Sequence, residues 1–403
     1  MIPHWRRKFI TLWTGQAFSI LSSAISQFAL TWYLTEKTGS TAVLALSMMA
    51  IMLPIALLSP FTGSFADRFD RRFIMVISDG AIGLVSLFLV ILSAQGKLTL
   101  GPILVVMLLR SIGSSFHSPC LQAVTPLVAP PDSLAKCAGW SQGIQTVSML
   151  LSPALAATLY ASIPLYWILL LDSVGAIFAI VGLLAARLPV LRVGKAGQKL
   201  RLWHDTRDGL RVLRSHTWLW QLCLVFGLFS MAFMPVAALF PLMSMGYFGR
   251  DAGAAAVVET LFSAGMLAGS IVLGVWGGTK NKMVAMVAAI LALGALLALC
   301  GLLPPSAFWT FAILSGLMGI AVPFFGSLFM ALLQEKVEPE YLGRVLGLSD
   351  SVMGLAAPLG LLPTALFGDY TGPSFWFLLA GILIIASGML VLALPAVRDC
   401  DRP

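Results

Sequence analysis

The 403-residue chain has few charged residues: Lys, Arg, Asp and Glu make up 10% of it, while 59% of its residues are hydrophobic. A water-soluble globule needs more polar surface than this composition provides. The apolar residues gather into runs of about 20, the length that an α-helix needs to cross a bilayer. We therefore expect an all-α membrane protein and not a barrel of alternating strands.

Cysteine and histidine are also scarce, and neither forms a recognisable site pattern. The five cysteines are scattered and odd in number, which speaks against a disulfide framework or a structural metal site. The four histidines form no H-E-x-x-H motif, and the sequence contains no nucleophile elbow and no phosphate-binding G-x-x-x-x-G-K-[ST] loop. His117 is of a residue type that titrates near neutral pH, although a capping or loop role is the commoner case. We expect no enzyme activity, no cofactor and no metal, with energy supplied by a proton gradient.

The apolar runs predict twelve spanning helices. Their expected ranges are 9–34, 41–62, 73–95, 100–120, 137–162, 164–187, 218–245, 254–276, 283–303, 306–333, 344–368 and 372–397. An even number of spans places both termini on the same side of the membrane. The segments between them include charged turns or loops at 63–72, 121–136 and 334–344.

The basic residues indicate which side this is. All but four of the 25 lysines and arginines fall in the termini or in the segments that share their side; the four exceptions are Lys37, Lys97, Arg110 and Arg250. Because basic residues accumulate on the cytoplasmic side of membrane proteins, both termini are predicted to be cytoplasmic in a multi-pass protein of the cell membrane. The formal net charge of +8 is then a topology signal, and no nucleic-acid partner is expected.

The sequence also predicts two related halves. Residues 131–142 match residues 339–350 at a constant offset of 208, which is about half of the chain. We expect an N-terminal six-helix bundle at 1–187, a cytoplasmic linker at 188–217 and a C-terminal six-helix bundle at 218–403. The stretch 202–213 is either a surface amphipathic helix or a solvated part of that linker. Such repeats allow one half to rock against the other around a central site.

A charged stretch, residues 63–73, separates the second and third expected spans. Its sequence, GSFADRFDRRF, resembles the signature G-x-x-x-D-R-x-x-R-[RK] of the major facilitator superfamily. The resemblance implies that superfamily's fold of two pseudo-symmetric six-helix bundles, with a cytoplasmic latch that opens when the halves rock; the alternative is that these charges only set topology. The latch residues would be Gly63, Asp67, Arg68, Arg71, Arg72 and, at the start of the eleventh span, Arg344.

Away from their ends, the expected spans contain five charged residues. Arg110 cannot lose its proton, so burial in the membrane requires a carboxylate or carbonyl partner. Its R-x-x-G context resembles a superfamily element that is associated with proton transfer, and a structural hydrogen-bonding role is the alternative. The acids Asp79, Asp172, Glu259 and Asp350 can each be neutralised by a proton, so each is a candidate for proton coupling or for pairing with Arg110.

Candidate cavity residues come from three spans. The first span carries a small polar face that either packs closely or faces a wet cavity. The seventh and tenth spans are rich in Phe and Met, which suits bulky lipophilic ligands but equally suits lipid. The substrate-cavity candidates are Gln16, Ser19, Ser23, Gln27, Phe229, Phe233 and Phe324.

Several short segments of the first half resemble the macrolide efflux (Mef) proteins, namely 15–17, 33–40, 110–113, 116–117, 123–127 and 136–142. The resemblance implies proton-driven antiport of lipophilic drugs, with macrolide antibiotics as the expected substrate and antibiotic resistance as the consequence. A siderophore or lipid-like metabolite is the alternative cargo, and a membrane-embedded enzyme or a channel are rival classes. The expected partners are a small lipophilic substrate, protons and membrane lipid; the chain is expected to be a monomer unless a separate nucleotide-hydrolysing partner drives it.

Overall fold

The computed structural model describes residues 5–128, 134–187, 217–276, 282–336 and 339–398. Within these ranges twelve helices are long and apolar enough to cross a membrane, as predicted. Their bounds are α1 (Trp5–Thr38), α2 (Thr41–Arg68), α3 (Arg71–Ala94), α4 (Leu100–Val128), α5 (Leu134–Ser162), α6 (Leu165–Ala185), α8 (Thr217–Leu242), α9 (Ala252–Trp276), α10 (Lys282–Leu302), α11 (Phe308–Lys336), α12 (Pro339–Thr371) and α13 (Pro373–Ala393). A π-helical turn (Met243–Tyr247) continues α8, and a short α14 (Pro395–Arg398) follows α13.

Several helices extend beyond the apolar runs that predicted them. α2 continues to Arg68 and α4 to Val128, while α5 begins at Leu134. The predicted loops 63–72, 121–136 and 334–344 are therefore wrong over most of their described length, since α11 also continues to Lys336 and α12 begins at Pro339. Hydropathy marks where the chain leaves the hydrocarbon, whereas a helix continues into water because its backbone hydrogen bonds are internal. The stretch 202–213 lies outside the described residues.

The turn between α2 and α3 is consequently very short. Asp70 is the N-cap of α3, where its carboxylate accepts a hydrogen bond from the backbone N–H of Arg72 at 3.1 Å. The same carboxylate lies 2.7 Å from Nη2 of the Arg72 side chain. A capping carboxylate satisfies a free N–H group at the start of the helix and interacts favourably with the helix dipole.

The chain divides into two compact units. The first contains Met1–Tyr33 and Pro54–Leu200, and the second contains Leu34–Leu53 and Arg201–Pro403. The start of α2 therefore belongs to the second unit, where it is held by α12. The Asp369 carboxylate of α12 accepts hydrogen bonds from the Ser40 hydroxyl at 2.8 Å and from the Ala42 N–H at 3.1 Å. Ser40 in turn accepts a bond from the Val43 N–H, so both residues cap α2.

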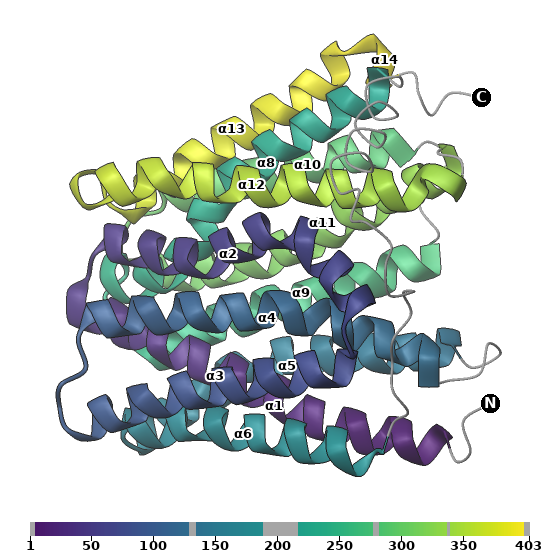
Figure 1. Cartoon of the computed structure of the whole chain (residues 1–403). Helices are drawn as coiled ribbons and strands as arrows, with labels where there is room; N and C mark the ends of the chain where they lie inside the picture. The colour runs from purple at the N-terminus through teal and green to yellow at the C-terminus, as the bar shows by residue number, and fades with distance from the viewer. Residues whose placement is uncertain (1–4, 129–133, 188–216, 277–281, 337–338, 399–403) are drawn as a thin grey trace. The chain divides into compact units, whose positions relative to one another are not determined.

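In the first unit α3 packs against α4 and α6, and Figure 1 shows α3 beside α6. The small-residue face of α1 packs against α6. A Cβ atom added to Gly15 would lie 2.5 Å from the carbonyl oxygen of Phe178, and the Ser26 hydroxyl donates a hydrogen bond to the Ile168 carbonyl at 3.0 Å. Small residues allow such close approach between membrane helices. This stripe of α1 is thus mainly a packing surface.

Replacing Gly15 by alanine should lower the melting temperature of the purified protein, because the added methyl group would meet α6 backbone that cannot move aside. The matched control is Gly101→Ala in α4, where an added Cβ meets nothing within 4 Å. There the replacement of a flexible glycine should leave stability unchanged or raise it slightly, because alanine restricts the unfolded chain more. Equal melting temperatures for the two variants would contradict the tight α1–α6 contact.

In the second unit α8 packs against α12 and α13, and α9 packs against α11. Figure 1 shows α8 running beside α13. Phenylalanines fill much of the space between α8 and α11: Phe226 lies across Phe325 with ring centroids 4.2 Å apart and across Phe329 at 4.3 Å. Edge-to-face aromatic packing of this kind stabilises the contact beyond the burial of its area.

Candidate functional site: buried charges in the first unit

Arg110 and Asp172 form an ion pair inside the first unit. Nη1 of Arg110, in α4, lies 3.0 Å from Oδ2 of Asp172, in α6, and the two side chains are 11% and 1% exposed. The N–H bonds of Nη1 are not directed at an acceptor, so this contact is electrostatic rather than a well-formed hydrogen bond. The carboxylate that Arg110 was expected to require is thus present, contributed by one of the four embedded acids.

Two serine hydroxyls complete the surroundings of Asp172. Ser86 of α3 donates a hydrogen bond to Oδ2 at 2.5 Å, and Ser23 of α1 donates one to Oδ1. Four helices therefore meet at one carboxylate, and we call Ser23, Ser86, Arg110 and Asp172 the Asp172 cluster. Hydrogen bonds and a cation both favour the charged form of a buried carboxylate, which would otherwise be costly in a membrane.

A second acid, Asp79 of α3, has its own partners. Nε2 of His117, in α4, lies 3.3 Å from Oδ1 of Asp79 without pointing an N–H at an acceptor. The Gln16 side chain of α1 donates a hydrogen bond to Oδ2 at 3.4 Å. We call these three residues the Asp79 cluster. His117 is thus a buried partner of a carboxylate and neither a cap nor a loop residue.

The two clusters are related by helical geometry. Each of three helices contributes one residue to each cluster, and the two residues are seven positions apart, which is about two turns or roughly 10.5 Å. The pairs are Gln16 and Ser23 in α1, Asp79 and Ser86 in α3, and Arg110 and His117 in α4. The first unit therefore holds two levels of buried polar groups along one line between its helices.

Replacing His117 by alanine should destabilise the protein by roughly 1–3 kcal/mol, because among the described residues Asp79 would then keep its long contact with Gln16 alone. Combining this change with Asp79→Asn should recover part of the loss, since no uncompensated charge then remains. Thermal unfolding of the two single variants and the double variant measures this coupling. Strictly additive losses would mean that the two side chains do not interact.

The other two embedded acids lie in the second unit. Glu259, in α9, is partly buried, and no hydrogen bond or ion pair links it to the described residues. Asp350 lies in α12, but its side chain is outside the described part of the structure. The proton-coupling assignments of both residues stay predictions.

The latch residues are only partly described. Gly63, Asp67 and Arg68 lie in the last turns of α2 and Arg344 lies in α12, but their side chains are outside the described part. Arg71 is buried and Arg72 pairs with Asp70. The cytoplasmic latch that these residues would form therefore stays a prediction.

The cavity candidates are four polar residues of α1 and three phenylalanines of α8 and α11. Gln16 and Ser23 belong to the buried clusters, while Ser19 and Gln27 are partly buried in α1. Phe229 stacks on Phe233 with ring centroids 5.8 Å apart. It also stacks on Phe325 of α11 at 4.2 Å. Phe324, its neighbour in sequence, is partly buried in α11. None of these seven residues lines a cavity that the structure describes, so their substrate contacts stay predictions.

Sequence reasoning did not find Ser86, nor the pairing of Asp79 with His117. The available signal was the seven-residue spacing in α3 and α4, which places Asp79 with Ser86 and Arg110 with His117 on matching faces of neighbouring helices. Buried serines are common in membrane helices. Ser86 differs from the others in its position beside Asp172, which lies on a neighbouring helix.

The comparisons with known proteins agree with this architecture. The family model of the Major Facilitator Superfamily matches residues 12–251 and 225–399. The chain is 40% identical over 400 residues to "Macrolide efflux protein A" of Streptococcus pyogenes, covering 99% of this chain and 98% of that protein. It is 24% identical over 414 residues to "Multidrug efflux pump Tap" of Mycobacterium tuberculosis, covering 96% and 95% of the two chains.

A solved structure shares the fold. A bacterial homologue of the iron transporter ferroportin, crystallised in an inward-facing state, matches with a TM-score of 0.76 at 14% identity, covering 98% of this chain and 99% of that one. Together with the family match over both halves and the twelve apolar helices, these similarities establish the class. The chain belongs to the Major Facilitator Superfamily and is a multi-pass membrane transporter, not an enzyme.

Proposed function

We propose that the protein exports macrolide antibiotics from the cell in exchange for protons. The substrate assignment rests on the 40% identity to a macrolide efflux protein along almost the whole of both chains. The similarity to a multidrug efflux pump supports drug efflux as the wider class. In this proposal the chain lies in the cell membrane as a monomer with both termini in the cytoplasm, because the basic residues favour that orientation.

The Asp172 cluster is the proposed proton-coupling site. Asp172 is a buried group that can gain or lose a proton, and it pairs with an arginine that stays charged. A proton on Asp172 would cancel the attraction across the 3.0 Å contact and leave Arg110 without its counter-charge. Since Arg110 lies in α4 and Asp172 in α6, protonation would loosen a link between two helices of the same unit. This couples proton binding to a change in helix packing.

The predicted cytoplasmic latch, which includes Asp67, provides the proposed conformational step. In this proposal the turn after α2 holds the start of α12 in one state and releases it in the other, so that the drug site faces alternate sides of the membrane. Drug export would then use the proton gradient, since the sequence carries no phosphate-binding loop for nucleotide hydrolysis. Release of a proton to the cytoplasm would accompany release of drug to the outside.

A susceptibility panel in a host that lacks its own efflux pumps tests the substrate. Expression of the chain should raise the inhibitory concentration of macrolides several-fold and leave that of unrelated hydrophilic antibiotics unchanged. Collapse of the proton gradient with an uncoupler should restore macrolide accumulation in the same cells. Unchanged macrolide susceptibility, with normal amounts of protein in the membrane, would refute the substrate assignment.

A further inference from the structure

A long apolar groove runs between α1 and α5 of the first unit. It consists of two adjoining cavities of about 580 and 770 Å³. They share four lining residues, namely Thr14, Ala17, Trp140 and Ile144. Because they share these walls, the two cavities form one continuous groove.

The groove has a polar end and an apolar body. At the start of α1 it is lined by Arg6, which is the one charged residue among its described lining residues. The rest of the first cavity is lined largely by aromatic rings, those of Trp5, Phe9, Trp13 and Trp140. The second cavity continues along aliphatic and small residues as far as Leu21 and Val147. A ligand that fits must therefore be apolar over most of its length and anionic at one end.

The length of the groove narrows the ligand class further. From Trp5 to Leu21 the α1 helix rises about 24 Å. One leaflet with its headgroup region is roughly 20–22 Å deep, half of the total bilayer thickness. A groove of this length, with a cation and tryptophans at its polar end, has the layout of a membrane interface, where Trp and Arg are common anchors.

We propose that this groove is a binding site for an anionic phospholipid, with the phosphate at Arg6 and one acyl chain along α1 and α5. Arg6 is exposed and its guanidinium stands 5.6 Å from the ring centre of Trp5, so its charge is held beside the mouth of the groove. The lining offers the phosphate a cation and no carboxylate. This charge selects an anionic headgroup, and it disfavours a cationic drug as the occupant.

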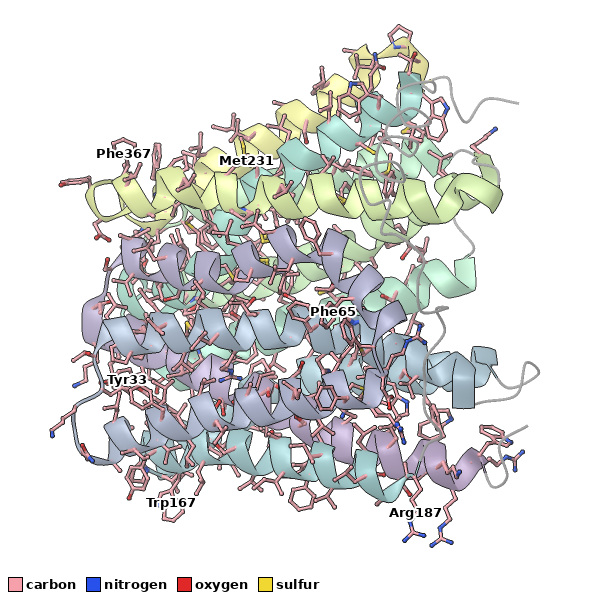
Figure 2. The ribbon with its side chains drawn as sticks, viewed as in Figure 1. Tyr33, Phe65, Trp167, Arg187, Met231 and Phe367 are labelled. Carbon is pink, nitrogen blue, oxygen red and sulfur yellow. The ribbon has the colours of Figure 1, made fainter. Side chains whose placement is uncertain are left out.

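Quenching of tryptophan fluorescence by brominated lipid tests the proposal. The full chain is reconstituted in vesicles of phosphatidylcholine and phosphatidylglycerol, with bromine on the acyl chains of one lipid or of the other at equal mole fraction. Brominated phosphatidylglycerol should quench more strongly than brominated phosphatidylcholine. Trp140→Phe should reduce this excess, because Trp140 lines the groove and is 64% exposed, and Trp5 and Trp13 of the same lining should keep the remainder. The Trp167→Phe variant should keep the stronger quenching by phosphatidylglycerol, because Trp167 lies on α6 and is not among the lining residues. Figure 2 shows Trp167 at the edge of the helices.

Substitution of two adjacent arginines, one at a time, distinguishes binding at a specific site from attraction by the general surface charge. Arg6→Gln should lower the relative affinity for phosphatidylglycerol about fivefold, the equivalent of about 1 kcal/mol for one cation near a lipid surface. Arg7→Gln removes an equally exposed charge that does not line the groove, so it should have a much smaller effect. Equal quenching by both lipids, equal effects of the two substitutions, or displacement of the quenching by a macrolide regardless of headgroup would overturn the proposal.

Discussion

Replacing Arg110 by alanine should reduce macrolide resistance to the level of cells that lack the protein. The change removes the cation that faces Asp172 at 3.0 Å and leaves the carboxylate, among the described residues, with two serine hydroxyls. A buried carboxylate without its cation costs several kcal/mol, so the exchange of a proton at Asp172 would no longer be tied to the contact between α4 and α6. The proton would then no longer be exchanged for drug. Inhibitory concentrations of a macrolide, measured at matched membrane protein levels, test this expectation.

A loss of folding would also abolish resistance, so the Arg110→Ala variant needs a control variant that folds. The double variant Arg110→Ala with Asp172→Asn contains neither charge, and its thermal stability should lie closer to that of the unaltered protein. It should still fail to confer resistance. If the Arg110→Ala variant alone kept full proton-driven efflux, Arg110 would have only a structural role and the coupling site would lie elsewhere.

Replacing Asp172 by asparagine should separate drug binding from drug transport. Asparagine has nearly the same shape and its oxygen can still accept a hydrogen bond from Ser23 or Ser86, so the chain should still fold, while Arg110 loses its counter-charge as it would beside protonated Asp172. It cannot exchange a proton, so efflux driven by a pH gradient should be lost. The purified variant should still bind a macrolide, since the change leaves the rest of the chain unaltered.

The embedded acid of α9 provides the discriminating control. Glu259→Gln should leave resistance largely intact, because Glu259 contacts neither of the polar clusters among the described residues. If Glu259→Gln abolished efflux while Asp172→Asn did not, the coupling acid would be in the second unit. Asp79→Asn should lower efflux less than Asp172→Asn does and more than Glu259→Gln does. Asp79 is two turns from the Asp172 cluster and has its own partner in His117.

Much of the fold could be predicted because a bilayer imposes one simple requirement on the sequence. Runs of about 20 apolar residues gave the twelve spanning helices. The ends of the helices were less accurate, as α2 and α4 show, because hydropathy reports contact with hydrocarbon while helix formation depends on backbone hydrogen bonds. Residues such as Asp67 and Arg68 are polar and still helical.

The candidate site was predictable only as a set of residue types. A lone arginine in a membrane helix requires an anionic or carbonyl partner, so a partner for Arg110 was expected. Which acid serves depends on how α4 and α6 are rotated toward each other, and a single sequence does not encode that rotation in any local pattern. For the same reason the polar face of α1 had two open interpretations: Ser26 contacts α6, whereas Gln16 and Ser23 bind the two carboxylates.

Exchange of drug for protons through Asp172 is the central step of the proposed cycle, and proton movement in proteoliposomes tests it most directly. A pH-sensitive dye is enclosed at equal internal and external pH, and a macrolide is added outside. Vesicles with the unaltered protein should show a faster rise in internal pH than protein-free vesicles or vesicles with Asp172→Asn, because each drug molecule that enters sends protons out. Macrolide uptake by the unaltered protein with a pH change no larger than in those two controls would contradict the account.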